Sequence, residues 1–316
     1  MTIPGGARLW ITLASAGFLL AALAGNLRQL LQLSLDPQGW CWLVLGVGLS
    51  LVSLLANGLA WGVGLGWLGH QPRWVALVQL FLRSNLRKYL PGGIWHLLAR
   101  VRSLRGDGGG VLAQPLHTPQ ALVAVLLDPL LMAVAALALL PLGGWQSGLA
   151  LLAPLALLLL LPRWLQPLLL RLERQRARQL AAQGLLLEEL NPEADATVLL
   201  PGYPWLPLLA ELGFVLLRFA GFACCVQAFD LAYALPWGGW VAGFAVAWTA
   251  GLVVPGAPGG LGVFEAVLLL RLAYAVPEAP LLALAVSYRL ITALADLIAA
   301  ATARADARQP LLPSEG

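Results

Sequence analysis

Long apolar runs, separated by short polar or glycine-rich connections, cover most of this chain of 316 residues. A transmembrane α-helix needs roughly 20 predominantly apolar residues. The pattern therefore predicts an all-α polytopic membrane protein with about eight transmembrane helices. The runs lie at residues 9–27, 40–68, 121–140, 149–161, 205–228, 237–254, 261–276 and 281–301. The first run has features of a secretory signal, but the many runs that follow favour a retained helix.

A shorter apolar run at residues 75–82 has a different character. It is too short to cross a bilayer and is followed at once by Arg83, Arg87 and Lys88. Apolar segments of this length are typical of interfacial or re-entrant elements. We therefore expect residues 75–82 to enter the membrane without crossing it.

Composition excludes a soluble protein. Hydrophobic residues make up 60% of the chain, charged residues only 11%, and the mean hydropathy is +0.81, whereas soluble domains carry about 25% charged residues. The net charge of +4 is modest, and no basic patch suggests a nucleic-acid partner. The three cysteines, Cys41, Cys224 and Cys225, lie in apolar runs without metal-ligand spacing. We expect no metal and no cofactor.

The chain reads as one integral membrane domain of residues 1–316. A first half at about 1–161 is followed by a polar segment at 162–204, a second half at 205–303 and a tail at 304–316. Lys and Arg concentrate at 69–119, at 162–204 and in the tail, while the other connections carry almost none. By the positive-inside rule these segments and both termini face the cytoplasm. The simplest interpretation of residues 162–204 is a solvated cytoplasmic helix and linker.

Charged residues inside the apolar runs are the main chemical signal. Each would cost about 2.5 to 3.5 kcal/mol on insertion scales if it faced lipid at mid-depth, so they must face an interior. Spacings of seven residues place Glu211 with Arg218, and Arg289 with Asp296, on one helical face. Each pair is either a structural ion pair or part of a functional site. The full set is Asp128, Glu211, Arg218, Glu265, Arg271, Arg289 and Asp296.

Asp128 directly precedes Pro129 in the middle of a run. Proline removes a backbone N–H and leaves a carbonyl of the preceding turn free. The pair predicts either a polar cavity at this depth or a structural kink with a protonated or paired carboxyl group.

A Pro-Gly-Gly-aliphatic tetrad occurs once in each half, and we call these the first and second breaks. Paired helix breaks are the best sequence indication of a transport site, because non-helical backbone in a membrane must be buried in protein or line a cavity. Cations and aromatic rings flank the first break and suit a lipid phosphate group, although positive-inside flanks explain part of the pattern. His96 alone is more typical of a structural imidazole than of a ligand. The candidates here are Arg87, Lys88, Tyr89, Pro91, Gly92, Trp95, His96 and Arg100.

The second break precedes a short apolar helix. Amide groups at a helix start attract an anion, but Glu265 in the first turn could satisfy the same amides as a cap. Both interpretations stay open. The candidates at this break are Pro258, Gly259, Gly260, Gly262 and Glu265.

These segments resemble the lysylphosphatidylglycerol synthase transmembrane-region family. Residues 87–95 with Arg100 are similar to its "KYxPGKxW" segment, residues 258–265 to its "PGGLGxxE" segment, and Ser287-Tyr288-Arg289-Leu290 with Asp296 to its closing helix. Asp128 lies where many members have an intramembrane acid. Gly93 and Phe264 stand where members often have Lys and Arg. If those cations hold a phosphate elsewhere, the resemblance leaves the task here to Arg87, Lys88, Arg100 or Arg271, or implies another substrate.

The resemblance implies movement of a lipid, or a lipid-linked group, between leaflets of a bacterial plasma membrane. The expected partner is an anionic phospholipid or a polyprenyl-phosphate-linked lipid, and a homo-oligomer is left open. The expected site combines the two breaks with Asp128, Glu265, Arg289 and Asp296, in two halves that are inverted repeats in one interpretation. Two alternatives are a membrane-embedded transferase, for which the chain lacks a known catalytic motif, and a structural or regulatory membrane partner. We expect no enzymatic activity.

Overall fold

The computed structural model describes residues 35–89, 95–106, 110–145, 148–182, 199–254 and 258–306. Within these ranges the regular structure is helical and no strand is formed. The prediction of an all-α fold is confirmed. The predicted first helix at 9–27 and the residues Pro91 and Gly92 of the first break lie outside the described ranges.

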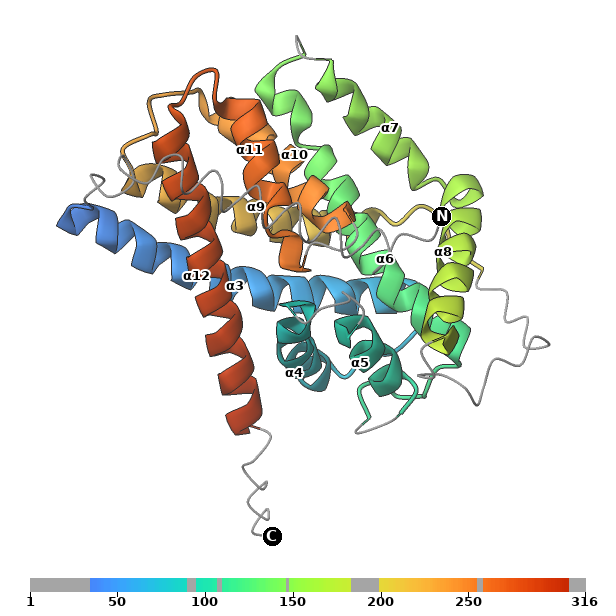
Figure 1. The fold of residues 1–316 in the computed structure, drawn as a ribbon. Coiled ribbons are helices and arrows are strands. Elements are labelled where there is room, and N and C mark those ends of the chain that lie inside the picture. The colour runs from blue at the N-terminus through green and yellow to red at the C-terminus, as the bar shows by residue number, and fades with distance from the viewer. Residues whose placement is uncertain are drawn as a thin grey trace.

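Helices of very different lengths pack into one body, in which α12 crosses α3, and α4 and α5 lie side by side against α3 (Figure 1). The elements are α3 (Pro37–Trp67), α4 (Trp74–Asn85), η1 (Leu86–Tyr89), α5 (Trp95–Leu104), α6 (Thr118–Leu137), η2 (Leu140–Gly143), η3 (Leu149–Leu151), α7 (Leu152–Leu159), α8 (Pro162–Ala182), α9 (Trp205–Ala228), α10 (Trp237–Val253), η4 (Pro258–Gly260), α11 (Val263–Leu272) and α12 (Glu278–Asp306).

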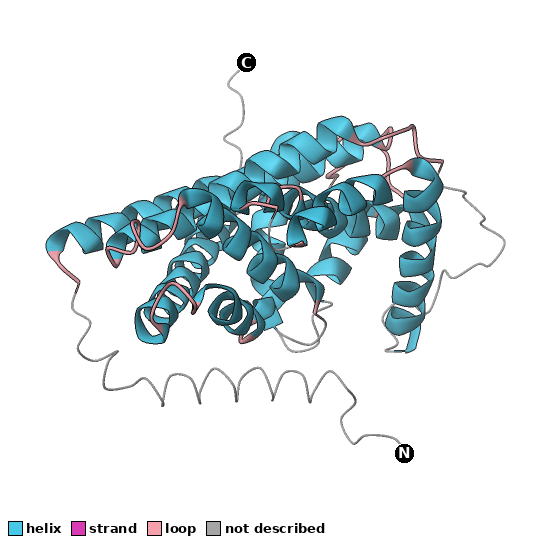
Figure 2. Cartoon of the chain, turned by 90° about the horizontal axis from the view of Figure 1, so that it is seen from above, coloured by secondary structure: helices cyan, strands magenta, loops and turns pink. Residues whose placement is uncertain are grey.

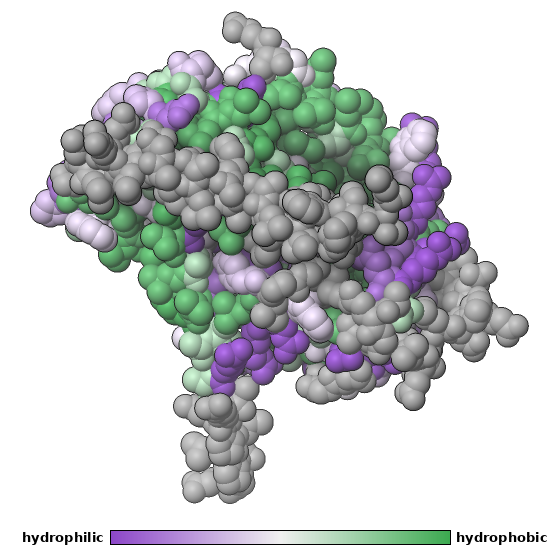
Figure 3. All heavy atoms as spheres, viewed as in Figure 1, coloured by the Kyte–Doolittle hydropathy of each residue, from purple (hydrophilic) through white to green (hydrophobic). Residues whose placement is uncertain are grey.

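Four helices, α3, α6, α9 and α12, are long and apolar enough to cross a bilayer. α7 and α8 pass the same test together, but a bend of 85° separates them. α10 is apolar with 17 residues, and α11 has 10. The described ranges therefore contain four or five candidate spans besides shorter apolar helices, and the number of about eight stays a prediction. Broad apolar surface surrounds the helices, while hydrophilic side chains gather along α8 and near the end of α12 (Figure 3).

Small residues bring α3 and α9 together along their lengths. Gly39 faces the Ala228 carbonyl, and a Cβ atom at Gly46 would lie 3.5 Å from the Gly221 carbonyl oxygen, so the two helices run antiparallel. Close backbone approach at small residues is the usual way in which membrane helices associate, because lipid removes the hydrophobic driving force between them. α3 and α9 form the platform on which the other elements are placed.

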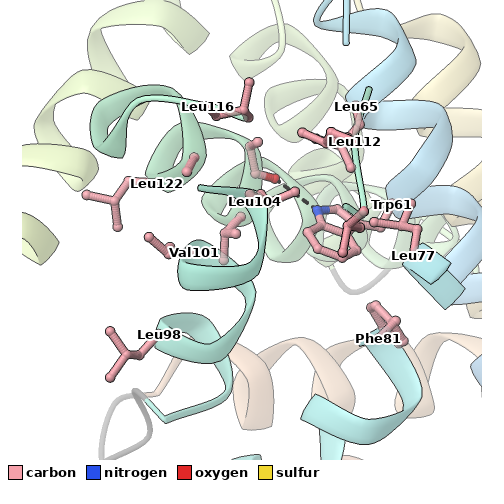
Figure 4. Close-up of a cluster of buried hydrophobic side chains, with 14 of the residues drawn as sticks. Trp61, Leu65, Leu77, Phe81, Leu98, Val101, Leu104, Leu112, Leu116 and Leu122 are labelled. Carbon is pink, nitrogen blue, oxygen red and sulfur yellow. Dashed lines mark hydrogen bonds between the residues drawn. The ribbon is translucent and has the colours of Figure 1, made fainter. Parts of the chain in front are cut away.

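Both breaks separate short helices rather than ending long ones. The first lies between η1 and α5, and the second lies between α10 and α11, where η4 forms a single turn. α4 and α5 bury apolar side chains such as Leu77, Phe81 and Val101 in a cluster with α3 and α6 (Figure 4). Trp61 of α3 also donates a hydrogen bond of 3.2 Å to the Ala124 carbonyl of α6. The first broken element is thus held inside the protein, as expected for a re-entrant segment.

α8 begins the polar segment at 162–204, yet one of its faces is buried. Leu165, Leu169 and Leu180 are at most 3% exposed, and the helix packs against α6. Seen from above, the described part of the chain consists of helices joined by loops (Figure 2). The first half of the polar segment therefore belongs to the packed body, which its charge-rich composition does not indicate.

A close contact at the start of α10 gives a test of this packing. A Cβ atom at Gly238 would overlap the Leu142 carbonyl oxygen of η2, whereas one at Gly239 would lie at an ordinary 3.8 Å from Leu235. We expect Gly238→Ala to lower the free energy of unfolding by about 1–3 kcal/mol, the usual effect of overpacking. Gly239→Ala is the matched control. Thermal unfolding in detergent measures both, and equal melting temperatures for the two variants would contradict the packing.

Candidate functional site

A cavity of about 310 Å³ lies between the two halves of the chain. The first break contributes Lys88 and Tyr89 before it, and His96 and Arg100 after it. The second break contributes Gly259 and Gly260. Long helices complete the lining with Asp128 and Pro129 of α6, Arg176 of α8, Arg218 of α9, and Tyr288, Arg289 and Thr292 of α12. The structure therefore brings most of the candidate residues to one hollow.

Arg289 holds the second break in place. Its Nε donates to Glu265 Oε1 at 2.8 Å, and its Nη1 and Nη2 donate to the carbonyl oxygens of Gly259 and Gly260 at 2.6 and 2.7 Å. Its guanidinium also lies over the Phe264 ring, 4.9 Å from the centroid. Each of the three nitrogens of this rigid, planar cation thus donates one hydrogen bond at the second break.

Glu265 is both a helix cap and an ion-pair partner. It is fully buried, and its Oε2 accepts a 2.7 Å hydrogen bond from the Gly262 amide while Oε1 faces Arg289. The backbone here needs glycine, because Gly259, Gly260 and Gly262 have φ angles of 61°, 74° and 78°. The expectation that the amides of this helix start would hold an anion is not met at Gly262, whose N–H is already used by Glu265.

Asp296 gathers the residues that precede the first break. It accepts hydrogen bonds from Asn85 Nδ2 at 2.7 Å and Tyr89 Oη at 2.6 Å, and it pairs with Lys88 Nζ at 2.7 Å. The carboxylate is 1% exposed. Of the two interpretations of Arg289 and Asp296, a direct ion pair along one helix is not formed: Arg289 pairs with Glu265 at the second break, and Asp296 pairs with Lys88 before the first break.

The predicted pair of Glu211 and Arg218 is likewise not formed. Glu211, 1% exposed, faces Asp128 within hydrogen-bonding reach. Asp128 in turn accepts a 3.2 Å hydrogen bond from Arg100 Nη1. Arg218 points instead to the cavity, with the Phe214 ring 5.9 Å from its guanidinium.

Arg218 has no carboxylate within ion-pair distance among the described residues, and its Nη1 lacks a hydrogen-bond partner there. It is 7% exposed. By contrast Lys88, Arg100 and Arg289 each pair with one carboxylate. A buried guanidinium without an ion-pair partner is costly, and the charge of Arg218 is balanced only at longer range by Asp296, so an anion in the cavity could pair with Arg218 directly.

Several candidates lie elsewhere. Arg87 is exposed and Trp95 is 38% exposed, and neither lines the cavity. Gly262 and Glu265 stand behind Arg289, and Pro258 begins η4. Arg271, considered for a phosphate, does not line the cavity either. Within the described ranges no group of three or more His, Cys, Asp or Glu residues could hold a metal ion.

The sequence of the chain matches one protein family over most of its length. The family model described as the lysylphosphatidylglycerol synthase TM region matches residues 8–300. The chain belongs to this family. A comparison with curated proteins gives no match. Together with the apolar helices, family membership makes this a multi-pass membrane protein with a lipid flippase-like membrane domain.

Two charged residues of the cavity are not among the site residues that the sequence predicts. Arg218 was noted as an intramembrane charge, but its spacing from Glu211 suggested an ion pair and not a place in a cavity. Arg176 lies in the polar segment, and nothing local distinguishes it from the neighbouring arginines of α8. Its place in the lining depends on how α8 packs on α6, which only the tertiary structure gives.

The Arg289–Glu265 pair can be tested by stability. Arg289→Ala leaves a fully buried carboxylate without its cation, so we expect a loss of about 3–5 kcal/mol. Combining it with Glu265→Gln should cost less than the sum of the two single changes, because the stranded charge is removed. Thermal unfolding of the single and double variants gives this coupling. Arg304→Ala, at an exposed position of α12, is the control, with an expected change within about 0.5 kcal/mol. Additive effects at 265 and 289 would contradict the pairing.

Proposed function

We propose that the protein moves an anionic, phosphate-bearing lipid between membrane leaflets, without covalent change to the lipid. The observation that carries the proposal is Arg218, a nearly buried guanidinium that lines a cavity shared by both halves and lacks a carboxylate partner among the described residues. Arginine suits phosphate because its planar fork matches two phosphate oxygens. Family membership supports a lipid as the source of that phosphate.

Neighbouring cations strengthen the case for an anion. Lys88 and Arg289 line the same cavity as Arg218. Both have an acidic partner, yet Lys88 holds Asp296 through a single ammonium group that is 23% exposed. A phosphate entering beside Arg218 could share Lys88 with Asp296, whose remaining hydrogen bonds from Asn85 and Tyr89 still satisfy it. Binding would then cost little desolvation of the carboxylate.

The two breaks offer a route for movement. Lys88 and Tyr89 join the first break to α12, and Arg289 joins α12 to the second break. Exchange of partners among these groups, triggered by the headgroup, would let the two halves shift against each other around a fixed binding point. The lipid tails stay in the bilayer, which requires the cavity to open sideways to lipid during transfer.

Topology is part of the same proposal. Lys and Arg concentrate in the segments at 69–119 and 162–204. We propose that these segments and both termini face the cytoplasm of a bacterial cell, with the protein in its plasma membrane. Lipid would then enter from the cytoplasmic leaflet, whose surface these cations approach.

The test uses Arg218→Gln, which keeps a polar side chain and removes the charge. In vesicles containing the purified protein, we expect transfer of a fluorescent anionic phospholipid to fall about tenfold or more, since a hydrogen bond to a charged group contributes about 1.5–3 kcal/mol. Dithionite quenching follows transfer between leaflets. Stability should fall less than for Arg289→Ala, because Arg218 has no carboxylate within ion-pair distance among the described residues.

Controls separate the alternatives. Arg304→Gln removes an exposed charge from α12 and should transfer lipid like the wild type. Parallel vesicles with a labelled polyprenyl phosphate test the other lipid source of a phosphate group. Vesicles with a labelled neutral diacylglycerol test whether transfer requires a phosphate group at all. Mass spectrometry of the recovered lipid detects a transferase. Equal transfer by wild type and Arg218→Gln, or a covalently modified lipid, would overturn the proposal.

A further inference from the structure

A second group of buried charges lies beside the same cavity, and the proposed phosphate site at Arg218 does not use it. It consists of Arg100 of α5, Asp128 of α6 and Glu211 of α9. These three side chains are 4%, 2% and 1% exposed. They come from three separate helices, so their meeting is a property of the fold and not of local sequence.

One positive charge faces two carboxyl groups here. Arg100 donates through Nη1 to Asp128 Oδ2 and through Nε to Ser84 Oγ, both at 3.2 Å. The rings of Phe81 and Trp61 lie 4.0 and 5.2 Å from the guanidinium. Aromatic faces and a hydroxyl thus complete its surroundings. Its single charge is matched by the single charge of Asp128.

An ionised Glu211 would therefore add a negative charge that no cation of this group balances. Its Oε2 and the Asp128 Oδ1 have no hydrogen-bond donor among the described residues, although the two carboxyl groups are within hydrogen-bonding reach of each other. Two ionised carboxylates at such a distance repel each other, and burial without a donor costs several kcal/mol more. One proton placed between them removes both penalties, because an O–H of one group then donates to an oxygen of the other.

No other described group competes for this role. Among the other elements packed against α6, α10 and α7 contain no titratable group, and the side chains of α3 that make polar contacts with α6 are Asn57 and Trp61. The other charged or titratable groups that line the same cavity are Lys88, Tyr89, His96, Arg176, Arg218, Tyr288 and Arg289. None of these groups is a carboxylate.

We propose that Asp128 and Glu211 form a proton-binding carboxyl pair, and that exchange of this proton with water in the cavity is coupled to lipid movement. The coupling rests on the proposed translocation, whereas the proton site does not. With the proton bound, the two carboxyl groups carry one negative charge and Arg100 neutralises it. On release, the O–H bond breaks, the proton passes to a cavity water as hydronium, and the cluster is left with one net negative charge.

The carboxyl pair lies where it can exchange a proton with water in the cavity and where its charge can act on the first broken element. Asp128 and Pro129 line the cavity, so water there can reach the carboxyl group, while Glu211 lies behind it. Pro129 has no backbone N–H for the Val125 carbonyl, which leaves α6 easier to bend at this level. Arg100 follows the first break on α5, so a change in its attraction to the pair acts on the broken element directly.

Charge also couples the proton to the headgroup. A net negative cluster beside the cavity weakens binding of an anion, and the protonated, neutral cluster permits it. By linkage, a bound anionic headgroup must then favour the protonated pair by the same factor. Proton and lipid are expected to enter and leave together, which makes a proton gradient a source of energy for the transfer.

Infrared spectroscopy tests the pair on the purified protein in lipid nanodiscs. A protonated carboxyl group has a C=O stretching band above the amide I band that shifts in D2O. At neutral pH we expect this band in the wild type and its loss in Glu211→Gln and in Asp128→Asn, because Arg100 keeps the one remaining carboxyl group ionised. Glu278→Gln, at an exposed position of α12, should keep the band. A band unchanged in both variants, or absent from the wild type, would overturn the proton site.

A second measurement tests the coupling. Vesicles that contain the protein, a pH-sensitive dye in the lumen and a potassium ionophore to hold the voltage receive labelled anionic phospholipid in the outer leaflet. We expect a lumen pH change that accompanies lipid transfer in the wild type and is lost in Glu211→Gln, whose amide imitates the protonated acid. Lipid transfer without a pH change would overturn the coupling and leave the infrared result to decide the pair. Absence of lipid transfer would overturn the proposed function and the coupling with it, while the infrared band is unaffected.

Discussion

Pairing of buried charges is the constraint on which the rest of this structure depends. An unpaired charge in an apolar interior is costly, and each described ion pair joins two different elements of the fold. Lys88 reaches Asp296, Arg100 reaches Asp128, and Arg289 reaches Glu265. Two of these pairs involve α12. This helix therefore holds both breaks, although neither break is adjacent to it in the sequence.

Stability alone does not account for this arrangement. A buried ion pair can often be replaced by well-packed apolar residues without loss, and this chain has no shortage of them. Its Phe222, Phe244, Phe264 and Tyr288 form a continuous aromatic cluster beside the second break. The charges instead surround a cavity at the place where the backbone is least regular. Such a distribution is typical of membrane proteins that handle an ion or a polar group at mid-depth.

The sequence predicted the membrane class, the helical fold and the residues of the cavity better than it predicted their partners. Hydropathy identified α3, α6, α9 and α12, because apolar length is a property of each segment alone. The breaks at residues 91–94 and 258–261 were evident from proline and glycine, of which the second is described by the structure. Seven-residue spacing, however, placed Arg289 with Asp296 and Glu211 with Arg218 on shared helical faces and left ion pairing open, whereas the described ion pairs join different elements. Helical spacing tells which residues share a face but not which neighbouring helix that face meets.

The same limit explains the remaining differences. α8 was interpreted as solvated because it carries several arginines, yet its buried leucines lie on one side and the helix packs against α6. Phe264 was recognised as a departure from the family pattern, but its position beneath the Arg289 guanidinium could not be seen without the fold. Such contacts depend on tertiary packing, which overrides what composition suggests for a single segment.

Tyr89 connects the second break with α12 through a rigid side chain. Its ring lies where a Cβ atom at Gly259 would come within 3.0 Å, and its hydroxyl is fixed on Asp296. A rigid phenol therefore fills the space between the turn at Gly259 and the Asp296 carboxylate of α12. Because an aromatic ring cannot bend, a displacement of this turn toward Tyr89 would be passed on to Asp296 and so to α12.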